Sequence, residues 1–227
     1  MKAIRYLING VVQGVGFRPF IYRIALENHL TGWVKNTSAG VELEVEGDEI
    51  ELEAFRSALI TEQPPLARIE NISDEYIPLN GHTAFTIKPS IKTSGEYSLV
   101  PPDYAICSDC ARELFDPSNR RYRYPFINCT NCGPRLTIIK EMPYDRSSTT
   151  MSFFGLCKKC ESEYNNPLDR RYHAEPIACP DCGPQVTLLG QSGIIKEKED
   201  AIQLTRKLIS DGKIIAIKGL GGYLLAC

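Results

Sequence analysis

Apolar residues near the start of the chain recur with the period of a strand and then with that of a helix. Ile4, Tyr6 and Ile8 alternate with other residues, which predicts a strand with one buried face. Pro19 suits the first turn of a helix that we expect to end near Asn28. The residues expected on the buried side of this helix are Phe20, Ile24 and Ala25.

A strict period of two returns further along the chain. Residues 32–37 and 41–46 predict a hairpin across residues 38–40, in which successive side chains face opposite sides of the sheet. One side carries Val41, Leu43 and Val45, and the other side carries Glu42, Glu44 and Glu46.

A second amphipathic helix and further strand segments complete this region. Asp48 is placed to cap the helix. The expected apolar stripe of this helix is Ile50, Leu52, Phe55 and Leu59. Residues 67–77 and 83–88 supply the last strand segments. The resulting order βαββαβ predicts an α+β domain over residues 1–90, namely a ferredoxin-like sandwich with an antiparallel sheet and two helices on one face.

The end of the chain predicts the start of another domain. Residues 91–105 are polar and then rich in proline, so we expect a linker. Residues 199–211 predict a helix, and residues 214–217 predict a buried strand for which we expect no strand partner downstream. A glycine-rich loop at 219–222 follows, too short to indicate a nucleotide site. We interpret residues 191–227 as the opening of a truncated α/β domain.

Eight of the nine cysteines form four Cys-x-x-Cys pairs, and the second half of this array repeats the first. Adding 50 to positions 107, 110, 129 and 132 gives 157, 160, 179 and 182. The segment Arg120-Arg121-Tyr122 likewise recurs as Arg170-Arg171-Tyr172. The repetition predicts two copies of one unit over residues 106–190, and only Cys227 has no counterpart.

Each copy has the spacing C-x2-C-x18-C-x2-C, which is typical of a tetrahedral Zn²⁺ site. Because sulfur fills all four positions, we expect two closed, structural zinc ions and no catalytic metal. The tandem repeat favours one ion held by Cys107, Cys110, Cys129 and Cys132, and a second held by Cys157, Cys160, Cys179 and Cys182. The alternative is a crossed arrangement, in which the first pair joins the fourth and the second pair joins the third. We interpret His173 as a surface or interface residue and not as a ligand.

Composition limits the compartment and the partners. The 227 residues are 43% hydrophobic, carry a formal net charge of −2, and contain no apolar run of the ~20 residues that a membrane helix needs. We therefore expect a cytoplasmic protein without a membrane partner, in which the cysteines stay reduced and bind metal. Arginines and tyrosines between the cysteine pairs suit a packed interface better than nucleic acid, because acidic residues lie among them. The residues concerned are Arg120, Arg121, Tyr122, Arg123, Tyr124, Arg170, Arg171 and Tyr172.

The loop at residues 12–18 carries the candidate chemistry of the first domain. Gly14 and Gly16 allow consecutive main-chain N–H groups to turn inward and form an anion-binding nest. The helix that starts after the loop adds a partial positive charge, and Arg18 can bind two phosphate oxygens at once. The expected phosphate-binding residues are Gln13, Gly14, Val15, Gly16, Phe17 and Arg18.

These residues carry a resemblance to a known family. The segment Gly10-Val-Val-Gln-Gly-Val-Gly-Phe-Arg18, followed by Gly32-Trp-Val-Lys-Asn36 and Val45-Glu-Gly47, resembles the acylphosphatase signature, and the match covers nearly all of residues 1–90. The resemblance implies two catalytic residues, Arg18 to bind phosphate and Asn36 to orient the attacking water. An acyl phosphate already has a good leaving group, so positioning the water and neutralising the phosphoryl oxygens should suffice.

A second resemblance extends over the whole chain. Intervals of 18, 24 and 18 residues separate successive cysteine pairs. Together with the segment from Asp211 to Cys227, they resemble the hydrogenase maturation carbamoyltransferases, the HypF family. The chain is similar to the N-terminal part of such a protein, with an acylphosphatase-like domain, a double zinc finger and the start of a YrdC-like domain.

Membership of this family implies a reaction that needs more than this chain. The full-length protein would use carbamoyl phosphate and ATP to carbamoylate a C-terminal cysteine of a partner maturation protein, which yields the cyanide ligand of nickel–iron hydrogenases. This chain is expected to hydrolyse carbamoyl phosphate to carbamate and phosphate without completing the transfer. The alternatives are a zinc-ribbon module that binds nucleic acid or protein beside a vestigial phosphate loop, and a general acylphosphatase.

Overall fold

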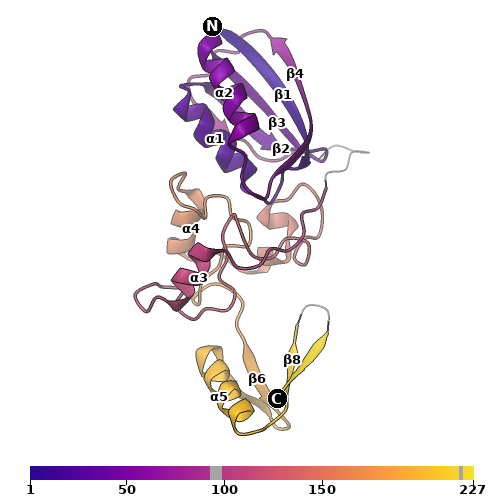
Figure 1. Cartoon of the computed structure of the whole chain (residues 1–227), viewed down its shortest axis with the longest axis vertical. Coiled ribbons are helices and arrows are strands. Elements are labelled where there is room, and N and C mark those ends of the chain that lie inside the picture. The colour runs from indigo at the N-terminus through magenta and orange to yellow at the C-terminus, as the bar shows by residue number, and fades with distance from the viewer. Residues whose placement is uncertain (93–98, 220–221) are drawn as a thin grey trace.

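The computed structural model of the chain describes residues 1–92, 99–219 and 222–227. Three parts follow one another along the long axis of the molecule: a sheet covered by helices, a cysteine-rich module, and a small C-terminal part (Figure 1). Within the described residues, no helix has the length and apolar character needed to cross a membrane.

The first part is the predicted ferredoxin-like sandwich. Its elements are β1 (Lys2–Val11), α1 (Phe17–Glu27), β2 (Thr31–Asn36), β3 (Val41–Gly47), α2 (Glu49–Thr61), β4 (Arg68–Ile77) and β5 (Phe85–Ile87). The sheet order is β4-β1-β3-β2-β5, and α1 and α2 cover one face (Figure 1). The antiparallel βαββαβ prediction is confirmed, and β5 adds a short edge strand parallel to β2.

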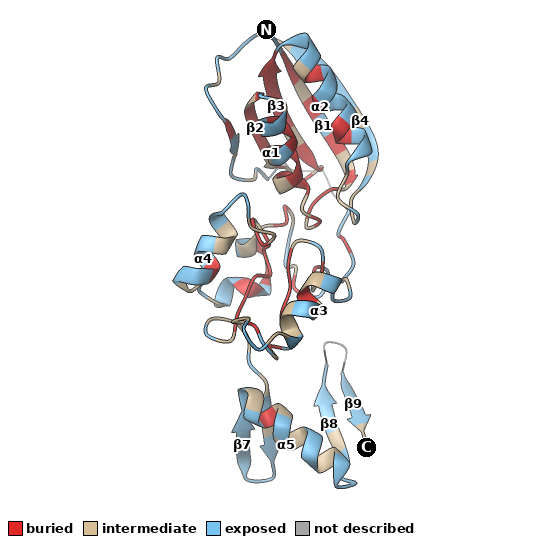
Figure 2. Cartoon of the chain, turned by 60° about the vertical axis from the view of Figure 1, so that its left-hand side comes forward, coloured by how far each residue is buried: buried red, intermediate tan, exposed pale blue. Residues whose placement is uncertain are grey.

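The core of this part follows the predicted alternation, because β1 and β3 pair with their apolar residues in register. Ile4 lies opposite Val45 and Tyr6 lies opposite Leu43, and all four are buried. The buried positions, coloured red in Figure 2, concentrate where the sheet meets the helices.

The stripe predicted for α2 is wrong at its first position. Leu52, Phe55 and Leu59 are buried, but Ile50 is 85% exposed. At about 100° per residue, Ile50 lies on the opposite side of the helix from Leu52. The helix begins with a capping box, in which the Asp48 side chain bonds the main chain of Glu51 and the Glu51 side chain bonds that of Asp48.

The face of the sheet opposite the helices is partly covered as well. Glu44 is only 4% exposed, and its carboxylate accepts hydrogen bonds from Arg5, from Trp33 Nε1 at 2.9 Å and from Asn80 Nδ2 at 3.1 Å. Burial opposes ionisation of Glu44, but hydrogen bonds with Arg5, His82 and Trp33 lower its pKa. The segment around Asn80 therefore buries the glutamate side of the predicted hairpin.

The cysteine-rich module contains little regular structure. Its elements are the helices α3 (Ser108–Phe115) and α4 (Lys158–Asn165) and the 3-10 turns η1 (Arg146–Ser148) and η2 (Thr150–Phe153). The predicted linker at 91–105 joins this module to the sandwich, and its residues 93–98 lie outside the described part. One end pairs with the sandwich, where Ile91 bridges Thr37, and the other end pairs with the module, where Tyr104 bridges Gly133.

The C-terminal part differs from the expectation in one respect. Its elements are β6 (Thr187–Gly190), β7 (Gly193–Glu197), α5 (Lys198–Ser210), β8 (Ile215–Lys218) and β9 (Tyr223–Ala226). The prediction that the strand after α5 has no downstream partner is wrong, because β8 pairs with β9 in antiparallel fashion. The five residues after the glycine-rich loop are enough for this hairpin. Residues 220–221 of the predicted loop lie outside the described part.

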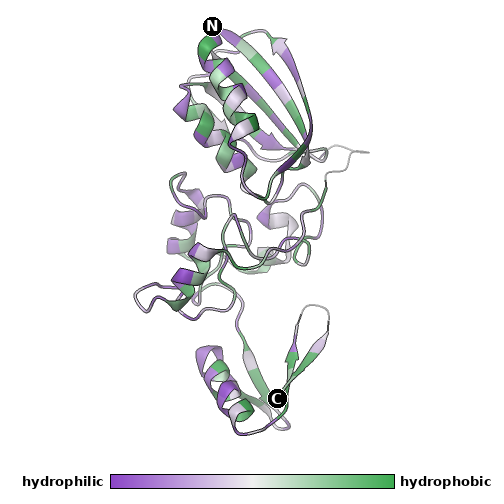
Figure 3. Cartoon of the chain, in the orientation of Figure 1, coloured by the Kyte–Doolittle hydropathy of each residue, from purple (hydrophilic) through white to green (hydrophobic). Residues whose placement is uncertain are grey.

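The hairpin of β8 and β9 has no buried face, contrary to the prediction of a buried strand. Ile217 is 45% exposed and Leu225 is 76% exposed. Figure 2 shows this part almost entirely in the exposed colour, and Figure 3 shows hydrophobic positions along the same strands.

Candidate phosphate site and metal centres

The loop after β1 has the backbone conformation that its glycines predict. Gly14 and Gly16 adopt φ values of 69° and 76°, in the left-handed region that glycine tolerates, and Gly16 is the N-cap residue of α1. Among the described residues, no acceptor takes a hydrogen bond from the main-chain N–H groups of residues 13–16. Four donors at the start of a helix are thus free to bind an anion.

Two side chains fix this loop against its neighbours. Gln13 Nε2 donates to the carbonyl oxygens of Thr37 at 2.7 Å and Gly40 at 2.9 Å, and Gln13 Oε1 accepts from the main-chain N–H of Tyr144 at 2.9 Å. Arg135 Nε donates to the carbonyl oxygen of Gly14. The cysteine-rich module therefore holds the loop from one side and the β2–β3 turn holds it from the other.

Arg18 lies in the first turn of α1 and is only 8% exposed. Its Nη1 lies 2.9 Å from Asp145 Oδ1, and its Nη2 lies 2.7 Å from Glu175 Oε1. Burial opposes the charged form, but these two carboxylates raise the pKa of Arg18. Both acidic residues belong to the cysteine-rich module.

Asn36 ends β2 and is 1% exposed. Its Nδ2 lies 3.4 Å from the carbonyl oxygen of Tyr144, and its Oδ1 has no hydrogen-bond partner in the described part of the chain. A buried acceptor without a partner is costly, so this amide oxygen is suited to bind water.

One small cavity, of about 20 Å³, joins these residues. Its lining includes Gln13, Gly14, Gly16, Phe17, Arg18 and Asn36 from the sandwich, and Tyr144, His173 and Glu175 from the cysteine-rich module. Of the expected phosphate-binding residues only Val15 is absent from this lining, because its side chain is buried in the apolar core.

His173 lies at the interface between the two parts, where it lines the small cavity beside Arg18. It packs against Tyr172 with ring centroids 4.6 Å apart, and its Nδ1 has no partner among the described residues. Burial, together with the nearby positive charge of Arg18, lowers the pKa of His173 to about 4. The imidazole is therefore neutral near pH 7.

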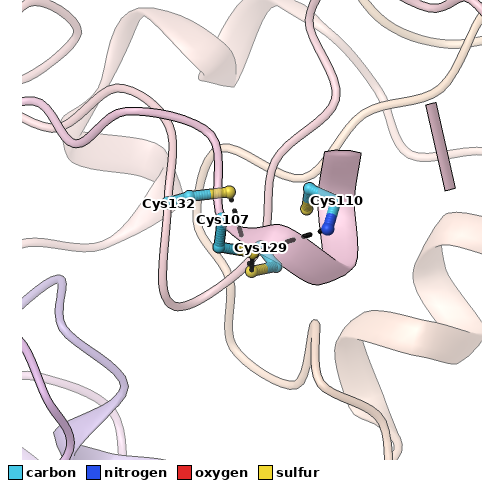
Figure 4. A group of neighbouring side chains, drawn as sticks. All are labelled: Cys107, Cys110, Cys129 and Cys132. Carbon is cyan, nitrogen blue, oxygen red and sulfur yellow. Dashed lines mark hydrogen bonds between the residues drawn. The ribbon is translucent and has the colours of Figure 1, made fainter. Parts of the chain in front are cut away.

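The eight paired cysteines form two groups of four that follow the tandem repeat and not the crossed arrangement. Cys107, Cys110, Cys129 and Cys132 form one group, and Cys157, Cys160, Cys179 and Cys182 form the other. Figure 4 shows the four side chains of the first group gathered around a common centre, with Cys110 on α3. Within each group the sulfur atoms all lie within 4.8 Å of one another.

The sulfur spacing suits a tetrahedral metal ion. Sulfur pairs lie 3.7 Å apart for Cys107 and Cys129, 3.8 Å for Cys129 and Cys132, and 3.8 Å for Cys157 and Cys179. Four Zn–S bonds of about 2.3 Å in a tetrahedron require an edge of about 3.8 Å. The two groups can therefore hold a metal with all four positions filled by sulfur.

The two repeats exchange their arginines. Arg120 of the first repeat donates to Cys160 Sγ at 3.2 Å and to Glu163 Oε2 at 2.6 Å. Arg170 of the second repeat donates to Cys110 Sγ at 3.2 Å and also binds Glu113. Each repeat thus supplies a cation to the sulfur cluster of the other.

The neighbouring arginines are also turned inward. Arg121 is 1% exposed and Arg171 is 4% exposed, and they bind Glu163 and Glu113 respectively. These two side chains therefore belong to an internal interface between the repeats.

Sequence patterns gave no sign of three residues at the candidate phosphate site: Tyr144, Asp145 and Glu175. They lie more than 100 positions from Arg18 in the chain, and neither a motif nor a period connects them to the loop. Only the packing of the module on the sandwich brings them to the site.

Two family models match the chain. The acylphosphatase model matches residues 4–87, and the HypF finger model matches residues 106–139 and 156–189. An acylphosphatase of Thermotoga maritima is 40% identical over 89 residues, which cover 39% of this chain and 98% of that protein.

Longer relatives match over nearly all of the chain. Carbamoyltransferase HypF2 of Cupriavidus necator is 51% identical over 99% of this chain and 28% of its own length. Carbamoyltransferase HypF of Synechocystis sp. is 52% identical over 100% of this chain and 30% of its own length.

Solved structures agree with these matches. A full-length HypF in its phosphate- and nucleotide-bound form superposes with a TM-score of 0.90 at 45% identity, covering 99% of this chain and 29% of that one. HypF of T. kodakarensis superposes with a TM-score of 0.88 at 54% identity, over 100% of this chain and 29% of that one. The chain spans 28–30% of the length of the curated HypF relatives described above. With an acylphosphatase domain followed by tandem HypF fingers, the chain belongs to the HypF carbamoyltransferase family.

Proposed function

We propose that this chain hydrolyses carbamoyl phosphate to carbamate and phosphate, as one step of a carbamoyl transfer. The observation that carries the proposal is the single cavity lined by Gly14, Gly16, Arg18 and Asn36. An anion there would meet main-chain N–H groups, a helix N-terminus and a guanidinium, which together recognise a phosphoryl group.

The reaction needs few protein groups beyond this arrangement. The loop and Arg18 would hold and neutralise the phosphoryl oxygens, and Asn36 Oδ1 would accept a hydrogen bond from the attacking water. The water oxygen bonds to phosphorus as the carbamate oxygen leaves with its electron pair, and the water gives up its proton to solvent or product. Residues 1–90 contain no cysteine, and the reaction needs no covalent intermediate.

The wider role of the chain is proposed on family membership. In the longer protein, the carbamate would be activated with ATP and passed to a C-terminal cysteine of a partner maturation protein, which would supply the cyanide ligand of nickel–iron hydrogenases. The name of the HypF relatives, carbamoyltransferase, supports this assignment. The two cysteine groups would each bind one structural Zn²⁺, because thiolate sulfur in a closed tetrahedral set favours zinc.

Enzyme-dependent phosphate release from carbamoyl phosphate tests the proposed hydrolysis. We expect Arg18→Ala to lower kcat/KM by at least about a hundredfold, because phosphoryl charge would lose its principal side-chain partner. Arg18→Lys keeps the charge but loses the two parallel N–H donors of the guanidinium, so phosphate release by this variant should also be slower.

The outcome that contradicts the proposal is unchanged release in the Arg18 variants with the fold intact. Fluorescence of Trp33, the only tryptophan, checks the fold of the sandwich. Acetyl phosphate serves as a comparison substrate, since equal turnover of both compounds would point to a general acylphosphatase.

A further inference from the structure

The phosphate site has too little free volume for its proposed substrate. A cavity of about 20 Å³ is close to the volume that one water molecule needs. A phosphoryl group brings four atoms beyond its link to the acyl group, so something must move before it can bind. Two residues of the cysteine-rich module also hold the terminal nitrogens of Arg18, with Asp145 on Nη1 and Glu175 on Nη2, so phosphoryl oxygens would compete with these carboxylates for the guanidinium.

The two carboxylates on Arg18 are held very differently. Glu175 is 1% exposed and, besides Arg18, accepts hydrogen bonds from Tyr164 Oη at 2.7 Å and from the main-chain N–H of Arg146 at 2.9 Å. Asp145 is 27% exposed, and Arg18 is the partner of its side chain among the described residues. Glu175 is therefore anchored by three donors, whereas Asp145 depends on one.

The Asp145 side chain also has a second hydrogen-bond donor within its own turn. It is the N-cap residue of η1, yet its side chain makes no capping hydrogen bond. Aspartate at such a position ordinarily accepts from the N–H two or three residues on. The main-chain N–H of Ser147 donates to no acceptor in the part of the chain that the structure describes.

The space around Asp145 permits this change. A larger cavity of about 590 Å³ is lined by Arg18, Asp145, Ser147 and His173, among others. A rotation of the Asp145 side chain toward Ser147 would stay within this cavity and would release Arg18 Nη1. Leaving Asp145 in place would instead set a carboxylate beside a phosphoryl dianion.

We propose that Asp145 of the cysteine-rich module is an exchangeable partner of Arg18, which the phosphoryl group of the substrate displaces. In the empty site Asp145 occupies one of the guanidinium donors that the phosphoryl oxygens would take. Glu175 stays bound to Nη2 and holds the guanidinium in position throughout. The inference rests on the proposed function of the loop, and it makes the module a part of the phosphate site.

The direct test is calorimetric titration of the 227-residue chain with inorganic phosphate. We expect Asp145→Asn to bind phosphate about tenfold more tightly than the unsubstituted chain, because the competing charge-assisted contact is weakened. Asparagine keeps the size and the capping ability of aspartate, so the variant should fold.

Glu175→Gln is the matched control, because it also removes one negative charge beside Arg18 without changing shape. We expect no gain in phosphate affinity from it, since Arg18 loses its anchor. An unchanged or weaker affinity in Asp145→Asn would overturn the proposal, and so would an equal gain in both variants, which would indicate a general charge effect.

Two further measurements complete the test. A crystal structure with phosphate should show the Asp145 carboxylate on Ser147 N–H, and a carboxylate still bound to Arg18 Nη1 beside the phosphate would refute the exchange. Arg18→Ala distinguishes this inference from the proposed function. If phosphate binds equally well without Arg18, the proposed site itself is wrong, whereas the exchange alone fails if only Asp145→Asn has no effect.

Discussion

Asn36 lies beside the loop of residues 12–18. Counting only residues that the structure describes, the main-chain N–H groups of residues 13–16 have no acceptor, and the buried amide oxygen of Asn36 has no hydrogen-bond partner. An asparagine at the end of a strand would usually bond its own backbone in a turn. The structure instead directs its Nδ2 toward Tyr144, at 3.4 Å, and leaves the Oδ1 for another donor. This geometry is what a water-orienting residue needs.

The Asn36 side chain yields a prediction at this scale. We expect Asn36→Ala to lower kcat for carbamoyl phosphate by about a hundredfold and to leave phosphate affinity nearly unchanged, because the lost contact is to the attacking water. Steady-state rates and phosphate titration separate the two effects. Asn28→Ala is the control, since Asn28 bonds Ile24 at the other end of α1 and should leave the rate unaltered. A variant of Asn36 that changes only KM would disprove the assigned role.

At the scale of elements, the two finger repeats are joined by reciprocal ion pairs, in which arginines that follow the helix of one repeat bind a glutamate on the helix of the other. The carboxylate of Glu163 on α4 receives Arg120 and Arg121, and that of Glu113 on α3 receives Arg170 and Arg171. Burial works against ionisation of Glu163, but the two guanidinium groups lower its pKa to about 2. The repeats are therefore not independent units, although each contains a complete set of sulfur ligands.

This exchange predicts that an arginine protects the metal group of the other repeat. Arg170→Ala should speed chelator-driven loss of metal from the group around Cys110 about fivefold, because a partly exposed charge-assisted hydrogen bond to sulfur is removed. Arg120→Ala should speed loss from the group around Cys160. Cysteine alkylation followed by peptide mapping identifies which group opens first.

The pair of variants provides its own control. The order of alkylation should reverse between Arg170→Ala and Arg120→Ala. If each substitution instead exposes the cysteines of its own repeat, the structural exchange does not stabilise the metal groups.

At the scale of the whole molecule, the sandwich and the finger module differ in what holds them together. The sandwich has a continuous apolar core shared by its sheet and helices, as the buried positions in Figure 2 show. The buried clusters of the finger module are small and centre on the cysteines themselves. Metal binding should therefore supply much of the folding free energy of the module and little of that of the sandwich.

Removal of metal should consequently unfold the finger module and leave the sandwich folded. With a strong chelator and a reductant, residues 106–190 should become open to protease, while urea unfolding followed through Trp33 should stay cooperative. Trp33 is 5% exposed in the sandwich and reports that part alone. We expect its unfolding free energy to fall by no more than about 2 kcal/mol, the scale of the lost interface contacts. Loss of the Trp33 transition on chelation would show that the sandwich depends on the metal.

The sequence by itself determined the sandwich and the eight cysteines that could bind metal, because both follow from short-range patterns along the chain. The period of two predicted which side chains of β1 and β3 face the core. The tandem repeat of the Cys-x-x-Cys pairs favoured one grouping of the sulfurs but left the crossed grouping open, and the structure decided between them. Sequence patterns failed at two positions. Ile50 is apolar but lies outside the core, and β8 pairs with a strand of only four residues that the pattern did not reveal.

Only the tertiary structure decided what surrounds Arg18. Asp145 and Glu175 reach its guanidinium across more than 120 positions of the chain, through the packing of one folded part on another. Periodicity and motif spacing describe neighbours along the chain and carry no information about such a contact. The arginines that cross between the finger repeats were hidden for the same reason, because a charge pattern does not say which carboxylate or sulfur it will meet.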